Sequence, residues 1–257
     1  MIYATILDKP IIELDEYFNL NDIPNLEKKM AYAIAKNKKN ITVAFSGPSG
    51  EIPTWLHNEN FIEVKDSWVQ VNNNLKNEDE WNLLSHDQQL FYTLLTTKSR
   101  SLNQALAIRT LNSMGGNGGK FHLKHLSSET IVTPAGKDFN FLLDWINQQK
   151  IFDEIGRVVI FLNPEGNCTP IHRDYPNKSH KDQFLWIRFN KQKDFFVYDV
   201  DTKQKHFTKG YISTFDNYQW HGGEPSEVMG FSLRIDGVFS VDFLEKTGLM
   251  NHFKTQS

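Results

Sequence analysis

Three residues in the second half of the chain have the types and spacing of a metal-binding set. His172 and Asp174 lie two positions apart in the segment NPEGNCTPIHRDY, and His221 follows 49 residues after His172. On extended backbone, residues i and i+2 point to the same side, so His172 and Asp174 can reach one metal ion while Arg173 points away. Two histidines and one carboxylate form the facial triad of non-haem iron(II) sites, which leaves coordination positions open. The pattern therefore predicts a metal centre that a co-substrate and dioxygen can both reach.

The His-x-Asp pair also has a simpler interpretation, because a histidine and an aspartate at a strand end can hydrogen-bond to each other without any metal. The order and spacing of the second histidine favour the metal site. His180 lies in the polar segment PNKSHKD and is interpreted as a loop residue rather than a further ligand. Cys168 lies close to the motif, but a small buried hydrophobic residue explains it as well as a chemical role does.

The segments around the motif are typical of antiparallel β-structure. After residue 155, short runs rich in β-branched and aromatic residues alternate with turn residues at fairly even intervals, as in sandwiches and barrels. The expected strands are 157–164, 182–190, 194–200, 205–209, 211–217 and 231–240. His172 is expected at the end of a further strand or just past it, and His221 just before a turn at Gly222 and Gly223.

The first part of the chain is expected to be mixed, with helices that support the β-rich part. Apolar spacing and capping signals predict helices at 21–38, 85–97, 101–116 and 137–149, and the run ITVAF predicts a strand at 41–45. No linker composition interrupts the chain. Residues 1–257 are therefore interpreted as a single domain, with a support region at 1–155 and a β-rich core at 156–245.

Composition narrows the functional classes. The 257 residues carry a formal charge of −3, so no basic field is available to grip duplex nucleic acid. A single cysteine excludes a disulfide framework within the chain. The N-terminal segment lacks the features of a signal peptide, and no stretch approaches the ~20 apolar residues of a membrane span. We therefore expect a cytoplasmic protein without a membrane anchor.

The stretch 157–240 resembles the catalytic core of the iron(II)/2-oxoglutarate-dependent dioxygenase superfamily. The family motif is His-x-Asp, a distal histidine and then an arginine or lysine, and this chain offers His172-Arg173-Asp174, His221 and Arg234. The lines NPEGNCTPIHRDY and GYISTFDNYQWHGGEP are similar to the approaches to the two histidine ligands. The aspartyl/asparaginyl β-hydroxylase-like branch is nearest in character, although its cation often falls where this chain has Phe231. The offset of Arg234 is closer to the taurine-dioxygenase-like pattern.

The resemblance implies an α+β fold with a double-stranded β-helix core of the jelly-roll or cupin-like type, supported by helices mostly from the N-terminal half. It implies iron(II) held by His172, Asp174 and His221, with 2-oxoglutarate as co-substrate. The far carboxylate of 2-oxoglutarate needs a buried cation, for which the planar fork of an arginine is suited. Arg234 is assigned that role, and Arg188 is the other candidate.

The functional hypothesis is a hydroxylase that uses dioxygen and 2-oxoglutarate, acts on an amino acid, a peptidyl side chain or a small molecule, and releases succinate and CO2. The carboxylate at Asp174 points to hydroxylation, because the halogenases of the family have a small residue there. Two alternatives stay open: a cupin-like metalloenzyme that does not use 2-oxoglutarate, and a non-catalytic binding module on the same barrel. The complete ligand set argues against the second.

Overall fold

The computed structural model describes residues 7–45, 68–70, 102–111, 130–163, 166, 169–172, 183–189, 194–199, 202–217, 219–225 and 228–253. The strands are β1 (Ile11–Glu13), β2 (Thr42–Phe45), β3 (Trp68–Gln70), β4 (Leu102–Leu111), β5 (Thr130–Val132), β6 (Phe152–Asn163), β7 (Thr169–His172), β8 (Gln183–Arg188), β9 (Phe195–Asp199), β10 (Gln204–Phe207), β11 (Ile212–Phe215), β12 (Trp220–Gly223) and β13 (Gly230–Phe239). The helices are α1 (Asp22–Lys36), α4 (Asn140–Gln148) and α5 (Val241–Thr247), with 3-10 turns η1 (Asp15–Tyr17), η2 (Lys38–Asn40), η6 (Ala135–Phe139) and η7 (Leu249–His252). None of these helices combines the length and the apolar character of a membrane span.

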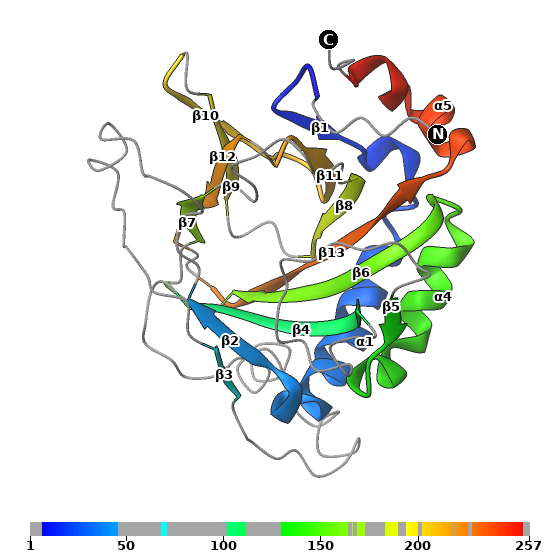
Figure 1. Ribbon diagram of the computed structural model, residues 1–257, viewed down its shortest axis with the longest axis vertical. Coiled ribbons are helices and arrows are strands. Elements are labelled where there is room, and N and C mark those ends of the chain that lie inside the picture. The colour runs from blue at the N-terminus through cyan, green and yellow to red at the C-terminus, as the bar shows by residue number, and fades with distance from the viewer. Residues whose placement is uncertain are drawn as a thin grey trace.

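In the described part of the chain the strands form two antiparallel sheets (Figure 1). The large sheet has nine strands in the order β1-β11-β8-β13-β6-β4-β2-β3, with β5 paired to β4. The small sheet has four strands in the order β10-β9-β12-β7. The β-rich architecture with few helices agrees with the coarse expectation of antiparallel β-structure supported by helices.

The strands from β6 to β13 alternate between the two sheets along the chain, except that the consecutive strands β9 and β10 both belong to the small sheet. β6, β8, β11 and β13 belong to the large sheet, whereas β7, β9, β10 and β12 belong to the small one. Each passage from one sheet to the other brings segments distant in sequence side by side, such as β6 with β13 and β7 with β12. This alternation is what sets residues of the predicted motif opposite one another.

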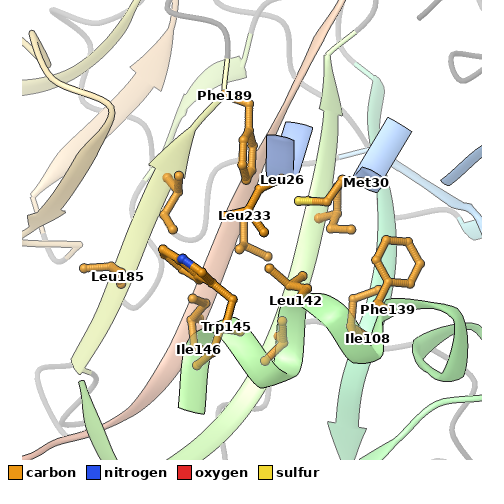
Figure 2. Packing of buried hydrophobic residues seen from close by; sticks show 14 of the residues in the cluster. Leu26, Met30, Ile108, Phe139, Leu142, Trp145, Ile146, Leu185, Phe189 and Leu233 are labelled. Carbon is orange, nitrogen blue, oxygen red and sulfur yellow. The ribbon is translucent and has the colours of Figure 1, made fainter. Parts of the chain in front are cut away.

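The outer face of the large sheet is apolar and is covered by helices. Helix α1 begins at Asp22, and its predicted apolar positions, including Met30, are buried against this face. Figure 2 shows Leu142 and Trp145 of α4 lying together with Leu185 of β8 and Leu233 of β13. Removing this apolar surface from water stabilises the fold at roughly 25 cal/mol per Å².

Helix α5 has a local signal at each of its two ends. Ser240 is its N-cap, and its hydroxyl accepts a hydrogen bond from the Phe243 amide at 3.2 Å. Gly248 ends the helix with φ of 65°, a conformation that glycine adopts without steric penalty. Of the described helices, α1 and α4 lie in the predicted support region 1–155, and α5 follows the last strand.

The predicted helix at 101–116 is wrong, because Leu102–Leu111 forms strand β4. This strand lies inside the large sheet between β6 and β2. Leu106 and Ile108 pack into the helix-covered core, whereas Ala105 and Ala107 pack with Val159 on the opposite face. A strand buried on both faces loses its polar–apolar alternation, and its continuous apolar run is then easily taken for a helix.

The turn expected at Gly222 and Gly223 is also wrong. Both glycines belong to β12, where they pair with Phe196 and Phe195 of β9. Cross-strand hydrogen bonds hold this backbone extended and override the local preference of two glycines for a turn. The predicted helices at 21–38 and 137–149 and the strand at 41–45 are confirmed, as are the later strands within a few residues, except that β6 begins at Phe152. The helix predicted at 85–97 lies outside the described residues.

Candidate active site

The two predicted histidine ligands lie on neighbouring strands of the small sheet. His172 is the last residue of β7, and His221 is the second residue of β12. The two are direct register partners in the antiparallel pair β7–β12. Cα atoms of such partners are about 4.5 to 5.5 Å apart. The fold thus brings together two positions that are separated by 49 residues in the sequence.

His221 is buried, with 3% of its surface exposed, and its ring has a defined orientation. Its Nδ1 lies 2.9 Å from the carbonyl oxygen of Gln219. Because a carbonyl oxygen only accepts hydrogen bonds, Nδ1 is the donor, and in the neutral imidazole Nε2 then has the lone pair. Histidines that bind a metal commonly donate their second ring N–H to a backbone carbonyl in this way. The donor chemistry of His221 therefore fits a metal ligand that binds through Nε2.

The third predicted ligand, Asp174, lies outside the described residues, as do His180 and Cys168. Within the described residues, no group of three or more histidine, cysteine, aspartate or glutamate side chains is placed to hold a metal ion. The ligand set His172, Asp174 and His221 therefore stays a prediction.

Arg234 lies on the inner face of the large sheet, the face that carries Phe184, Trp186 and Phe215 toward the small sheet. It is buried, with 4% of its surface exposed. Its Nε donates to Asp236 at 2.8 Å, and its guanidinium carbon lies 3.9 Å from the centre of the Phe184 ring. Charge pairing and the aromatic face together hold a cation that would otherwise be expensive to bury.

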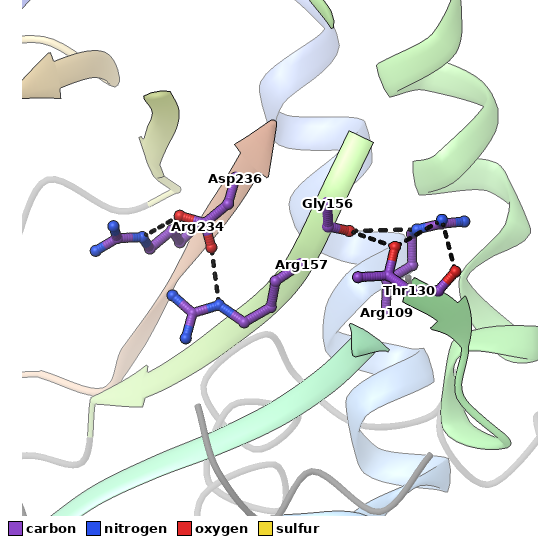
Figure 3. Close-up of polar contacts among 6 residues, drawn as sticks. All are labelled: Arg109, Thr130, Gly156, Arg157, Arg234 and Asp236. Atoms are coloured by element: carbon purple, nitrogen blue, oxygen red, sulfur yellow. Dashed lines mark hydrogen bonds and ion pairs between the residues drawn. The ribbon is translucent and has the colours of Figure 1, made fainter. Parts of the chain in front are cut away.

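A second arginine, Arg157 of β6, shares the same aspartate. Its Nε donates to the other oxygen of Asp236 at 2.8 Å, and its side chain is also 4% exposed. Figure 3 shows Asp236 between Arg157 and Arg234, which project from the same face of β6 and β13. The three side chains together carry one net positive charge. The motif spacing points to neither Arg157 nor Asp236, although the alternation Ser-Leu-Arg-Ile-Asp in β13 places Asp236 on the same side as Arg234.

Aromatic rings connect the histidine end of the site to the arginines. The His221 ring lies 5.2 Å from the ring of Phe215, and Phe215 lies 4.7 Å from Phe184 in an edge-to-face arrangement. Phe184 is in turn the ring that Arg234 covers. His221 and Arg234 therefore belong to one aromatic cluster that spans the two sheets.

Trp186 of β8 lies between the large sheet and the small sheet. Its ring centre is 5.6 Å from that of Phe161 on β6 and 5.6 Å from that of Phe195 on β9. It is also the register partner of Arg234, so the two residues stand side by side on β8 and β13. Its buried Nε1 makes no hydrogen bond with any described residue.

Arg188, the alternative co-substrate cation, is bound to backbone carbonyls. Its Nη2 donates to the carbonyl oxygens of Thr208 at 3.0 Å and Gly210 at 2.6 Å, and its Nε donates to that of Gly210. Burial lowers the pKa of Arg188, and the nearby carboxylates, among them Glu13, partly offset this effect. The contacts fasten Arg188 to the segment between β10 and β11, so its guanidinium is already used in holding the fold.

The comparisons with known proteins give distant structural similarities. No protein-family model matches the sequence, and no curated protein matches it. Among solved structures, a prolyl-4-hydroxylase from Pseudomonas putida is 12% identical, covers 53% of this chain and 70% of its own, and has a TM-score of 0.31. A member of the 2OG-Fe(II) oxygenase family from Burkholderia pseudomallei is 12% identical over 52% of this chain and 67% of its own, with a TM-score of 0.35.

A prolyl hydroxylase from Trichoplax adhaerens is 10% identical, covers 95% of this chain and 100% of its own, and has a TM-score of 0.35. TM-scores of this size are too low to establish a shared fold. The strand order and the residue contacts therefore carry the functional interpretation.

Proposed function

We propose that this protein is an iron(II)- and 2-oxoglutarate-dependent oxygenase that hydroxylates an amino acid or a peptidyl side chain. The single observation that carries the proposal is the register of the small sheet, which pairs His172 with His221. These are the two histidines that the sequence motif selects as ligands. Two residues so far apart in the chain have no local reason to be register partners.

The proposed core is a double-stranded β-helix made by β6 to β13. Its support is the alternation of these strands between the two sheets, with four strands of the core in each. In such a double-sheet jelly roll the side chains between the sheets are enclosed, which suits a site that must exclude water.

In the proposed metal centre, His172, Asp174 and His221 bind iron(II), and the bound iron supplies the activation of dioxygen. His221 binds through Nε2, because its Nδ1 proton is held by the carbonyl of Gln219. The Gln219 contact also fixes the ring plane, so the imidazole need not reorient when metal binds. The aromatic rings of Phe195 and Phe215 keep water away from the buried side of His221.

Arg234 is the proposed partner of the far carboxylate of 2-oxoglutarate. Its burial strengthens any charge pairing, and its position over Phe184 fixes the guanidinium plane. Arg188 is the weaker candidate, because its guanidinium already donates to Thr208 and Gly210. The binding energy of the co-substrate is then concentrated on one oriented guanidinium.

The test is ligand-induced stabilisation in the presence of manganese, which replaces iron without turnover. We expect manganese together with N-oxalylglycine to raise the melting temperature, with a gain of about 2.7 kcal/mol at ~100 times Kd. The variant His221→Ala should lose this metal-dependent shift. His206→Ala is the matched control, because His206 also lies in the small sheet but on β10, with its side chain 41% exposed.

Turnover of 2-oxoglutarate to succinate with iron(II) and air completes the test. Stabilisation by manganese without any further effect of N-oxalylglycine would favour the cupin-like metalloenzyme. Ligand binding without succinate formation, across a panel of amino acids and peptides, would favour the non-catalytic binding module. A wild-type protein that takes up neither iron nor manganese would refute the proposal.

A further inference from the structure

The inner face around Arg234 contains more hydrogen-bond donors than one arginine supplies. The side chain of Arg157 is only 4% exposed. Among the described residues only Asp236 binds its guanidinium, by accepting a hydrogen bond from Nε. The Nη1 and Nη2 edge of Arg157 is therefore not used by any described residue. In Figure 3 the Nη atoms of Arg157 point away from Asp236.

Two further polar atoms on the same inner face make no hydrogen bond with a described residue. The hydroxyl of Ser232 is buried, with 3% of the residue exposed, two positions before Arg234 on the same face of β13. The Nε1 of Trp186, on the register partner of Arg234, is also buried. An indole N–H can only donate, and a serine hydroxyl can donate as well as accept. A buried donor without a partner loses its hydration at a real energetic cost, so such atoms on one face indicate a missing acceptor.

We propose that Arg157 is a second carboxylate-binding residue of this inner face, and that Asp236 is the positioning residue that fixes the two guanidinium groups. Each oxygen of Asp236 accepts one arginine Nε, which sets the direction of both arginine planes. A planar fork held in this way binds a carboxylate with two parallel hydrogen bonds.

The ligand chemistry is a carboxylate, and it has two sources in an oxygenase of the proposed kind. One is the far carboxylate of 2-oxoglutarate, and the other is a carboxylate of the primary substrate. This inference rests on the proposed function for the identity of the ligand but not for the existence of the anion site. An anion site of two arginines needs no metal. Binding of a simple dicarboxylate without metal therefore tests the anion site independently of the proposed function.

The experiment compares wild type with Arg157→Gln and Arg157→Lys. Arg109→Gln is the control, because Arg109 is a part-buried arginine of the same sheet whose donors go to Thr130 and the carbonyl of Gly156. Titration calorimetry measures N-oxalylglycine with manganese and, separately, succinate without metal. We expect Arg157→Gln to weaken N-oxalylglycine by about tenfold or more, Arg157→Lys to weaken it less, and Arg109→Gln to leave it unchanged.

A second arm identifies the source of the carboxylate. The manganese and N-oxalylglycine form is melted with free amino acids and with the corresponding amides. If Arg157→Gln binds N-oxalylglycine normally but no longer responds to the free amino acids, the carboxylate belongs to the primary substrate and the assignment of Arg157 stands. If neither N-oxalylglycine, nor succinate, nor any amino acid depends on Arg157, the inference is overturned.

Folding and the proposed function are controlled separately. Arg157→Lys keeps the charge and most of the stem, so it reports on the fork even where the glutamine variant fails to fold. A wild-type protein that takes up no metal but binds succinate through Arg157 would refute the oxygenase and leave this anion site standing. In the opposite outcome, the protein takes up metal and N-oxalylglycine, both Arg157 variants bind them as wild type does, and the amino-acid arm shows no dependence on Arg157. That result would refute this inference and leave the proposed oxygenase standing.

Discussion

On the outer face of the large sheet, β13 presents Leu233 and Ile235 to the helix-covered core. On the inner face the same strand presents Ser232, Arg234 and Asp236. All five residues are at most 4% exposed. This part of β13 is therefore buried on both faces, but one face is hydrocarbon and the other is polar and charged.

We expect the apolar face of β13 to contribute mainly to stability and the polar face mainly to the proposed ligand binding. Burying apolar side chains stabilises a fold. Replacing a buried ion cluster by apolar residues is often neutral or stabilising as well. The arginines and the aspartate of the inner face therefore do not need to be there for the fold. We infer that their place on an enclosed face serves a ligand that carries negative charge.

The largest expected effect comes from removing the shared carboxylate of the inner face. Asp236→Ala leaves Arg157 and Arg234 buried without it, and we expect a loss of about 3 to 5 kcal/mol in the free energy of unfolding. Urea denaturation followed by tryptophan fluorescence measures this. The control Asp153→Ala, at an exposed position of β6, should stay within ~0.5 kcal/mol. Equal losses in the two variants would contradict the role of the cluster.

The outer face should respond in stability but not in binding. Leu233→Ala removes a fully buried side chain and should cost about 2 to 5 kcal/mol. The affinity for N-oxalylglycine in the presence of manganese should remain that of wild type, measured well below the lowered melting temperature. A large loss of affinity would mean that the two faces are coupled and that the comparison is too simple.

Arg188 and Arg234, the two arginines that the sequence offers for binding the co-substrate, should differ in the effect of substitution. Arg188→Gln removes bonds to the carbonyls of Thr208 and Gly210, and we expect about 1 to 3 kcal/mol of destabilisation with unchanged N-oxalylglycine affinity. Arg234→Gln should lower that affinity instead. Calorimetric titration of both variants decides the matter. An affinity loss confined to Arg188→Gln would exchange their roles.

The smallest effect is expected for a buried hydroxyl that has no described partner. Ser232→Ala should change the free energy of unfolding by no more than ~1 kcal/mol, because no hydrogen bond to a described residue is lost. Thr133→Ala is the contrasting control, since its buried hydroxyl donates to Ala107 at 2.7 Å and accepts from Gly136 at 2.9 Å. A loss for Ser232→Ala as large as that for Thr133→Ala would show that its hydroxyl is bonded in the native protein.

Much of the local structure could be predicted because it has a local cause. The helix α1 was indicated by the spacing of its apolar residues, and strands such as β8 and β9 by short runs of β-branched and aromatic residues. Strand β4 could not be predicted in this way, because its surroundings bury both of its faces and remove the alternation that marks a strand. The β12 glycines were misjudged for a related reason, since pairing of both glycines with β9, and of Gly223 also with β7, outweighs the local turn preference.

Some residues of the candidate site could likewise be predicted from the sequence, and others could not. The His-x-Asp spacing, the distal histidine and the later arginine pointed to His172, Asp174, His221 and Arg234. No spacing pointed to Arg157, because it lies 79 positions from Asp236 and contacts it only after β6 and β13 pair.

The sequence by itself determined which residue types are available and which neighbours along a strand share a side, because backbone geometry fixes the direction of side chains over a few residues. Only the tertiary structure decided that His172 faces His221 in register, that Arg157 meets Arg234 at one aspartate, and which side of β13 is covered by helices. The reason is that strand partners and enclosed faces are chosen by packing over the whole chain. No short stretch of residues contains that information.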